Sequence, residues 1–301
     1  MPHFHAELVP AMLTPMNRDL SVDYEKAERL AKHLVQNGCD GLLINGTTGE
    51  SPTLTLDEKI ELVKVAKQGA GGKAQIMVGA GSNDTEKTLS DAKKMVQLGI
   101  DALLIVVPYY NKPNQRGMFE HFKRIAQGVD AEIVIYNIPS RSVVRMEAET
   151  MAKLHRECPN IIGVKQSHPD MDAVSEITAL LPQESWLTWC GDDTLTLPMM
   201  ACGAHGTISV IAHLTGLMMR EMIQAVKQGN QQRALELHLK QLHLGRELFF
   251  LPNPTVVKTM MAKLGMMEGT MRLPLVEPEP DEMKRIDALL AHYKSILPQT
   301  V

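Results

Sequence analysis

Residues 132–165 read EIVIYNIPSRSVVRMEAETMAKLHRECPNIIGVK. The stretch opens with an apolar run of strand length at 132–137 and closes with a second at 161–165. Between them, over 145–156, apolar residues recur at the spacing of a helix. The two runs do not alternate with polar residues, which is typical of parallel strands buried on both faces. The stretch therefore predicts one strand–helix–strand unit of an α/β protein.

The same unit recurs along the chain. Eight apolar runs of strand length begin roughly 20 to 35 residues apart, the length of a βα unit. They lie at residues 7–13, 41–45, 75–80, 102–107, 132–137, 161–165, 187–190 and 207–210. Eight such units predict a (β/α)8 TIM barrel over residues 1–228. An open doubly wound sheet is the alternative, but it calls for a glycine-rich nucleotide loop after the first strand, where residues 13–17 read LTPMN.

Helices are predicted between the strands and beyond the barrel. Those in the barrel lie at 24–36, 56–68, 85–98, 118–127 and 145–156, and the C-terminal region, 229–301, is predicted to be helical, with helices at 231–250, 254–264 and 281–296. The stretch between Asp193 and Arg220 has no charged residue and is long enough to cross a bilayer. Pro198 and several glycines and histidines interrupt it, so it is interpreted as helix, turn, buried strand, turn.

Composition excludes several classes of protein. Of the 301 residues, 44% are apolar, which suffices for a large core, and the net charge of −4 argues against a nucleic-acid binder that works by overall charge. The four cysteines contain no CxxC pair and predict buried thiols rather than a disulfide framework. The N-terminus MPHFH lacks the basic and apolar segments of a signal peptide. A cytoplasmic protein with no nucleic-acid or membrane partner is expected.

Lys165 is the most informative residue of the quoted stretch. In a barrel the active site lies at the carboxyl ends of the strands, and an apolar run leads directly into this lysine. Desolvation favours the neutral amine, which attacks a carbonyl to form a Schiff base. The alternative is a strand-end lysine that pairs with a carboxylate or extends to solvent.

Hydroxyl groups follow neighbouring strands. Tyr136 and Tyr110 lie at two strand ends and Thr47 lies on a third loop, and their hydroxyls both donate and accept protons, as a relay for Schiff-base chemistry requires. The alternative for each tyrosine is an amphipathic plug at the barrel rim. Arg141 follows Pro139 and is a candidate clamp for a substrate carboxylate, or else a surface cation.

A catalytic metal is not expected. The chain has 11 histidines but no HExxH motif, and His238 and His243 are five residues apart, off the spacing of a helical metal pair. No cofactor is expected either.

Four motifs, in order, resemble those of one family. They are GTTGE at 46–50, YYNKP at 109–113, YNIPSR at 136–141 and GVK at 163–165. Together they are similar to the dihydrodipicolinate synthase family of pyruvate-dependent class I aldolases, which also includes N-acetylneuraminate lyase. The similarity runs from Ala11 to Leu275, and the paired threonines favour the synthase branch.

The resemblance implies a role for each matching residue. Lys165 would form the Schiff base with pyruvate, and Tyr136 would exchange protons with help from Thr47 and Tyr110. Tyr110 would reach in from a neighbouring subunit, so a homo-oligomer, with a dimer of dimers favoured, is expected. Substrate-binding positions would be Thr48 and Ile208 for pyruvate, Arg141 for the carboxylate of aspartate semialdehyde, and Gly191 at the end of the seventh strand.

The implied activity is 4-hydroxy-tetrahydrodipicolinate synthesis. Pyruvate would condense with L-aspartate 4-semialdehyde in the biosynthesis of diaminopimelate and lysine. The alternatives are another aldolase or lyase of the same family, or a non-catalytic barrel that binds a keto acid. Two departures from the family near the predicted mouth bear on the second substrate. The lysine is followed by QSHPD at 166–170, where EA(S/T)GD is usual, and His213 stands where asparagine is usual.

A regulatory site is also implied. Many family members are inhibited by lysine, and Ser51, Asn83 and Tyr109 match positions of that site. Lys59 and Lys87 stand where lysine-sensitive members often have histidine and glutamate. A cationic side chain repels the ammonium group of lysine, so weak or absent inhibition is expected.

Overall fold

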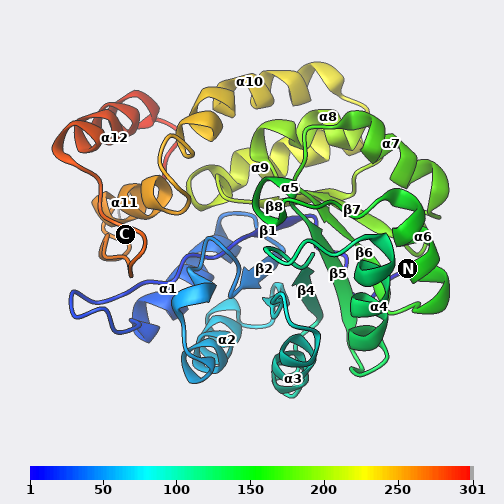
Figure 1. Ribbon diagram of the computed structural model, residues 1–301. Coiled ribbons are helices and arrows are strands. Elements are labelled where there is room, and N and C mark those ends of the chain that lie inside the picture. The colour runs from blue at the N-terminus through cyan, green and yellow to red at the C-terminus, as the bar shows by residue number, and fades with distance from the viewer. Residues whose placement is uncertain (299–301) are drawn as a thin grey trace. The chain divides into compact units, whose positions relative to one another are not determined.

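The fold is an eight-stranded parallel barrel. A computed structural model describes residues 1–298. Its strands are β1 (Leu8–Pro10), β2 (Gly41–Ile44), β3 (Gln75–Gly79), β4 (Ala102–Val106), β5 (Glu132–Asn137), β6 (Ile161–Gln166), β7 (Leu187–Cys190) and β8 (Gly206–Ser209). Hydrogen bonds join them in the order β1-β8-β7-β6-β5-β4-β3-β2, and a parallel bridge between Ala11 and Leu43 links the chain after β1 to β2. The predicted TIM barrel is confirmed (Figure 1).

Helices separate the strands and complete the chain. They are α1 (Tyr24–Gln36), α2 (Leu56–Ala70), α3 (Thr85–Val96), α4 (Gln115–Ala126), α5 (Pro139–Ser142), α6 (Ala148–Glu157), α7 (Met171–Leu180), α8 (Thr196–Ala201), α9 (Ala212–Lys227), α10 (Gln231–Glu247), α11 (Thr255–Lys263) and α12 (Pro280–Tyr293). Two short 3-10 turns, η1 (Ser51–Thr53) and η2 (Asp193–Leu195), lie after β2 and β7.

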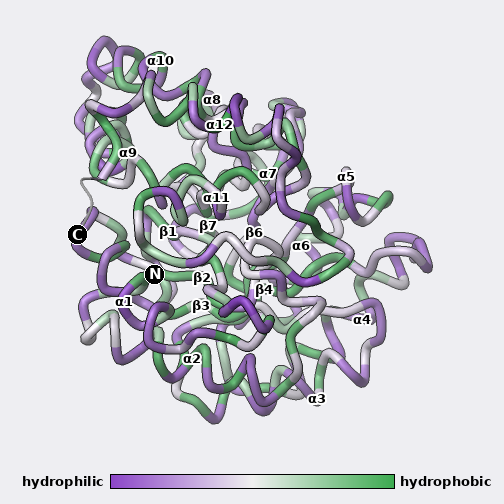
Figure 2. Tube along the Cα trace, turned by 90° about the vertical axis from the view of Figure 1, so that its left-hand side faces the viewer, coloured by the Kyte–Doolittle hydropathy of each residue, from purple (hydrophilic) through white to green (hydrophobic). Residues whose placement is uncertain are grey.

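The chain divides into two compact units, and the first comprises residues 1–7 and 75–208. Its strands β3 to β7 pair in parallel, and β4 and β6 are buried along almost their whole length. Helices α3, α4, α6 and α7 follow one another along the outside of these strands (Figure 1). Their hydrophobic and hydrophilic residues alternate along the trace, as expected for helices with one buried face (Figure 2).

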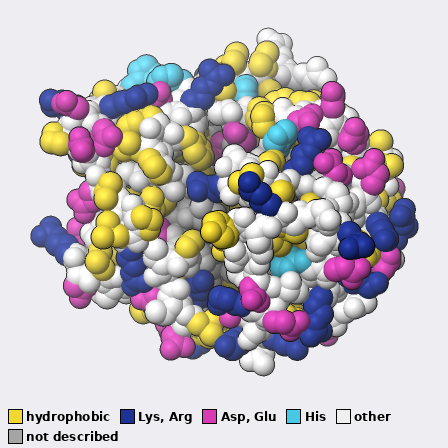
Figure 3. Space-filling model, in the orientation of Figure 1, with side chains coloured by type: hydrophobic (Ala, Val, Ile, Leu, Met, Phe, Trp, Pro, Cys, Tyr) yellow, Lys and Arg dark blue, Asp and Glu magenta, His cyan; other side chains and the backbone are white. Residues whose placement is uncertain are grey.

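The second unit comprises residues 8–74 and 209–298. Its first two helices begin at side-chain caps: Asp23 caps α1, and Thr55 with Glu58 forms a capping box at α2. Helices α1 and α2 pack against each other, as do α9 and α10. Acidic and basic side chains are interspersed on the face of the molecule shown in Figure 3.

Several predicted boundaries are wrong, for local reasons. The strand predicted at 7–13 ends at Pro10. After it, the Ala11 N–H donates to the Ser209 carbonyl, whereas the Met12 N–H donates to the Leu43 carbonyl. The helix predicted from residue 118 begins at Gln115, because the Asn114 side chain caps it by accepting from the Gly117 N–H.

One more helix start and one turn also differ from the prediction. The helix predicted from 145 begins at Ala148, because the backbone of Met146 is bonded on both sides to the Asn137 side chain. Within 193–220, the turn predicted after the buried strand is the start of helix α9. Helix α7, at 171–180, was not predicted.

Two predictions from composition are tested by the same structure. The four cysteines are unpaired thiols, three of them buried, and burial raises the pKa of Cys39 and Cys190. Among residues 1–298, none of the helices combines the length and hydrophobicity that a bilayer-spanning segment requires.

Candidate active site

Lys165 and Tyr136 lie side by side at the carboxyl ends of two paired strands. They are register partners in the β5–β6 ladder, so their side chains point to the same face of the sheet. The Lys165 Nζ atom lies 4.3 Å from the centroid of the Tyr136 ring. The two residues are 6% and 8% exposed. The structure thus brings these two sequence-predicted residues together, with a buried lysine side chain against a phenol ring.

Gly191 gives the Lys165 side chain its space. It directly follows β7, and its N–H donates to the Gln166 carbonyl at 2.8 Å. A Cβ atom on Gly191 would lie 2.9 Å from Cε and 3.1 Å from Cγ of Lys165, closer than side chains normally approach. Any larger residue would displace the lysine stem, so a glycine is needed here.

The other predicted residues of this unit differ from one another in exposure. Ile208 is buried on β8, whereas Arg141 is exposed on the short helix α5. Tyr110 has a left-handed backbone, φ 72°, and is 86% exposed. Among the described residues, none is hydrogen-bonded to the Tyr110 hydroxyl.

The paired threonines lie in the other unit, on a tight turn after β2. The turn is closed by backbone hydrogen bonds from Gly49 and Ser51 to the Gly46 carbonyl. Thr48 is buried, and its Oγ1 accepts from Asn253 Nδ2 at 2.9 Å, while Thr47 is half-buried. The Thr14 hydroxyl donates to the Gly49 carbonyl at 2.6 Å. These bonds fix the loop backbone and the Thr48 side chain.

A buried ion pair holds the end of this loop. Glu50 and Lys258 are 1% and 0% exposed, and Oε1 of the carboxylate lies 2.5 Å from Nζ of the lysine. Oε2 accepts from the Arg272 N–H at 3.1 Å. Burial lowers the pKa of Lys258, and the Glu50 carboxylate opposes that shift. The sequence analysis missed Lys258, which lies four residues after the Asn253-Pro254 pair, on the helix that follows it.

The predicted regulatory residues are distributed over both units. In the first, the Lys87 ammonium pairs with Asp91 at 2.9 Å, and the Asn83 carbonyl accepts from the Asn111 side chain at 2.9 Å. Tyr109 is 39% exposed. In the second, Ser51 begins η1 and Lys59 lies on α2.

His213, one of the departures from the family pattern, is fully buried. Its Nε2 accepts from the Leu13 N–H at 3.2 Å, and its Nδ1 bonds the Val210 carbonyl at 2.8 Å. Burial lowers its pKa to about 4, so the ring is neutral at neutral pH. Both ring nitrogens are therefore occupied by backbone partners.

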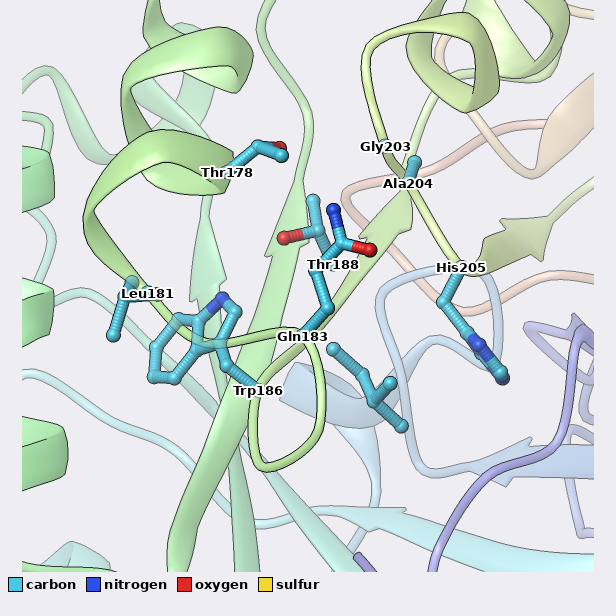
Figure 4. Close-up of a pocket in the computed structure, with 9 residues that line it drawn as sticks. Thr178, Leu181, Gln183, Trp186, Thr188, Gly203, Ala204 and His205 are labelled. Atoms are coloured by element: carbon cyan, nitrogen blue, oxygen red, sulfur yellow. The ribbon is translucent and has the colours of Figure 1, made fainter. Parts of the chain in front are cut away.

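Residues 1–298 contain no group of three or more His, Cys, Asp or Glu side chains placed to hold a metal ion. A pocket of about 240 Å³ lies at the amino-terminal end of β7, lined in part by Thr178, Gln183, Trp186 and His205 (Figure 4). It is at the opposite end of this strand from Gly191 and contains none of the predicted site residues.

Comparison with known proteins places the chain in a family. Residues 5–293 match the model of the dihydrodipicolinate synthetase family. A 4-hydroxy-tetrahydrodipicolinate synthase of Listeria welshimeri is 44% identical over 94% of this chain and 97% of its own length. A dihydrodipicolinate synthase structure from Aquifex aeolicus is 43% identical and has a TM-score of 0.93. The match covers 98% of this chain and 100% of that chain. The chloride-inhibited synthase of Acinetobacter baumannii, complexed with pyruvate, is 32% identical with a TM-score of 0.91, over 96% and 98% of the two chains.

The barrel and these relatives define an enzyme of the lyase class. Within that class, the chain belongs to the dihydrodipicolinate synthetase family.

Proposed function

We propose that this enzyme condenses pyruvate with L-aspartate 4-semialdehyde to form 4-hydroxy-tetrahydrodipicolinate, in the biosynthesis of diaminopimelate and lysine. The observation that carries the proposal is the buried Lys165 amine against the Tyr136 ring, at the strand ends of a chain that belongs to this family. The names of the relatives and the pyruvate complex of one of them support the choice of substrates.

The chemistry begins at Lys165. Its amine attacks the keto carbon of pyruvate, and the carbinolamine loses water to give an imine. Loss of a proton from the methyl group gives an enamine, whose carbon attacks the aldehyde and forms the new C–C bond. The amino group of the semialdehyde then attacks the imine carbon, which closes the ring and releases Lys165. Each step moves a proton, and Tyr136 is the group placed to exchange it, with Thr47 and Tyr110 in the relay.

Other residues are proposed to bind the two substrates. Thr48 and Ile208 contact pyruvate, Gly191 leaves space for the adduct beside Lys165, and Arg141 holds the carboxylate of the semialdehyde. The exposure of Tyr110 supports a homo-oligomer, because a hydroxyl held in solvent by its own chain can serve the site of a neighbouring copy. A dimer is the smallest assembly that meets this requirement, and a dimer of dimers is the proposed form.

Borohydride trapping tests the proposal directly. Incubation of the enzyme with pyruvate and borohydride should give a stable adduct that peptide mass spectrometry locates on Lys165. A coupled assay with aspartate semialdehyde and other aldehydes then identifies the second substrate. Absence of an adduct would indicate a non-catalytic keto-acid binder, and a strong preference for another aldehyde would indicate a different aldolase of the family.

We also propose that lysine inhibits this enzyme weakly or not at all. Lys59 and Lys87 add positive charge where a lysine ligand presents its own ammonium group, and the Asp91 carboxylate beside Lys87 is already paired with it. Initial rates measured against lysine should show no half-maximal inhibition below the millimolar range. Half-maximal inhibition at sub-millimolar lysine would contradict this proposal.

A further inference from the structure

A second side chain, that of Ser167, shares the face of β6 on which Lys165 lies. Side chains alternate along a strand, so residues 165 and 167 point to the same side and Gln166 points to the other. Gln166 follows this pattern, because its Oε1 accepts from Asn137 Nδ2 at 3.0 Å. The Ser167 N–H donates to the Asn137 carbonyl at 2.9 Å, which continues the β5–β6 ladder past its last paired residue. Ser167 is therefore the next residue after Lys165 on that face, toward the carboxyl end of the strand.

Gly191 shows how close the two side chains are. A Cβ atom on Gly191 would lie 1.9 Å from Ser167 Oγ and 2.9 Å from Lys165 Cε. Both distances start from one point, so the hydroxyl oxygen and the lysine carbon are no farther apart than the sum of the two, about 4.8 Å. The hydroxyl thus lies beside the lysine stem that carries the reacting amine.

The Ser167 hydroxyl is buried and has no hydrogen-bond partner among the described residues. Buried polar side-chain atoms nearly always have one, and exceptions in native structures need an explanation. The backbone around Ser167, in contrast, is hydrogen-bonded. The Ser167 N–H donates to the Asn137 carbonyl, and the Gln166 carbonyl accepts from the Gly191 N–H. A rigid backbone therefore holds an unpartnered donor and acceptor next to Lys165.

The position of this hydroxyl along β6 selects the substrate that it meets. Active sites of such barrels open at the carboxyl ends of the strands. A residue two places beyond Lys165 lies roughly 6.6 Å farther along the strand, toward that opening. Under the proposed function Lys165 holds pyruvate covalently, so the molecule that enters later, from the opening, is the aldehyde.

We propose that Ser167 is a specificity-determining residue whose hydroxyl hydrogen-bonds the aldehyde substrate as it approaches the enamine. The inference rests on the proposed function, because it takes Lys165 to carry the first substrate. The proposal adds a contact to the second substrate. This contact is made by Ser167, which lies in the segment 166–170, where the chain departs from the family pattern.

The test compares Ser167→Ala with Ser167→Thr. The alanine variant should lower kcat/KM for aspartate semialdehyde about tenfold, mainly through its KM, as expected for the loss of one hydrogen bond. Its KM for pyruvate and its borohydride adduct on Lys165 should equal those of the wild type. The threonine variant keeps a hydroxyl and should stay within about threefold of the wild type. Ser175→Ala, on the exposed face of α7, removes a hydroxyl bonded to the Met171 carbonyl and should change neither constant.

Three results would overturn the proposal. An unchanged aldehyde kcat/KM in Ser167→Ala would mean that the hydroxyl contacts no substrate. Equal losses in the alanine and threonine variants would mean that packing, rather than the hydroxyl, matters. A rise in the KM for pyruvate alone would assign the hydroxyl to the first substrate. A wild-type enzyme that traps no pyruvate would contradict the proposed function itself, which the trapping control detects separately.

Discussion

Replacement of Lys165 by alanine should abolish the borohydride-trapped pyruvate adduct and lower kcat by roughly 10⁴-fold or more, as removal of a covalent nucleophile does in other enzymes. No other described side chain supplies a buried amine against the Tyr136 ring, so nothing remains to form the imine. Lys165→Met, which keeps most of the side-chain volume, should lose activity equally. Mass spectrometry of the reduced adduct and the coupled assay measure the two effects.

A second lysine offers a matched control. Lys153 Nζ lies 4.2 Å from the centroid of the Phe119 ring, almost the same geometry as Lys165 over Tyr136, but Lys153 is exposed on α6. Lys153→Ala should leave both trapping and kcat unchanged. If Lys165→Ala keeps the adduct, or if Lys153→Ala loses it, then burial at the strand end is not what makes the amine reactive.

The pair formed by Lys165 and Tyr136 could be predicted because it depends on strands alone. An apolar run that ends in a lysine fixes the position of the residue at the end of the strand. The preceding run contains Tyr136 near its end, and the parallel pairing of the two strands sets the two residues in register. Ser167 was within reach of the same argument, since it lies two residues after Lys165.

Features that depend on side chains distant in sequence could not be predicted. The late start of α6 follows from the Asn137 side chain, which takes both backbone groups of Met146. Tyr110 is 86% exposed and has a positive φ that no sequence pattern signals. The support of the Thr48 loop comes from Asn253 and Lys258, which lie about two hundred residues along the chain.

Loss of the Lys258 side chain should strongly destabilise the fold, because this side chain is the partner of the buried Glu50 carboxylate. In Lys258→Ala the Glu50 carboxylate would stay buried without its partner, which typically costs about 3–5 kcal/mol. Since roughly 1 kcal/mol shifts the melting temperature of a domain of 150–250 residues by 2–4 °C, a fall on the order of 10 °C is expected. Calorimetry of the full chain measures it. The Thr47–Thr48 turn ends at Glu50, so the KM for pyruvate should also rise in the variant that remains folded.

The double variant Glu50→Gln with Lys258→Met separates the charge from the packing. It removes both charges and keeps most of the volume, so it should recover much of the stability that Lys258→Ala loses. Lys240→Ala is the control, because Lys240 pairs with Glu236 at 2.7 Å on an exposed helix face and should leave the melting temperature almost unchanged. Equal effects of Lys258→Ala and Lys240→Ala would show that burial does not make the Glu50–Lys258 pair important. A double variant as stable as the wild type that still binds pyruvate poorly would instead show that the ion pair positions the loop more than it stabilises the fold.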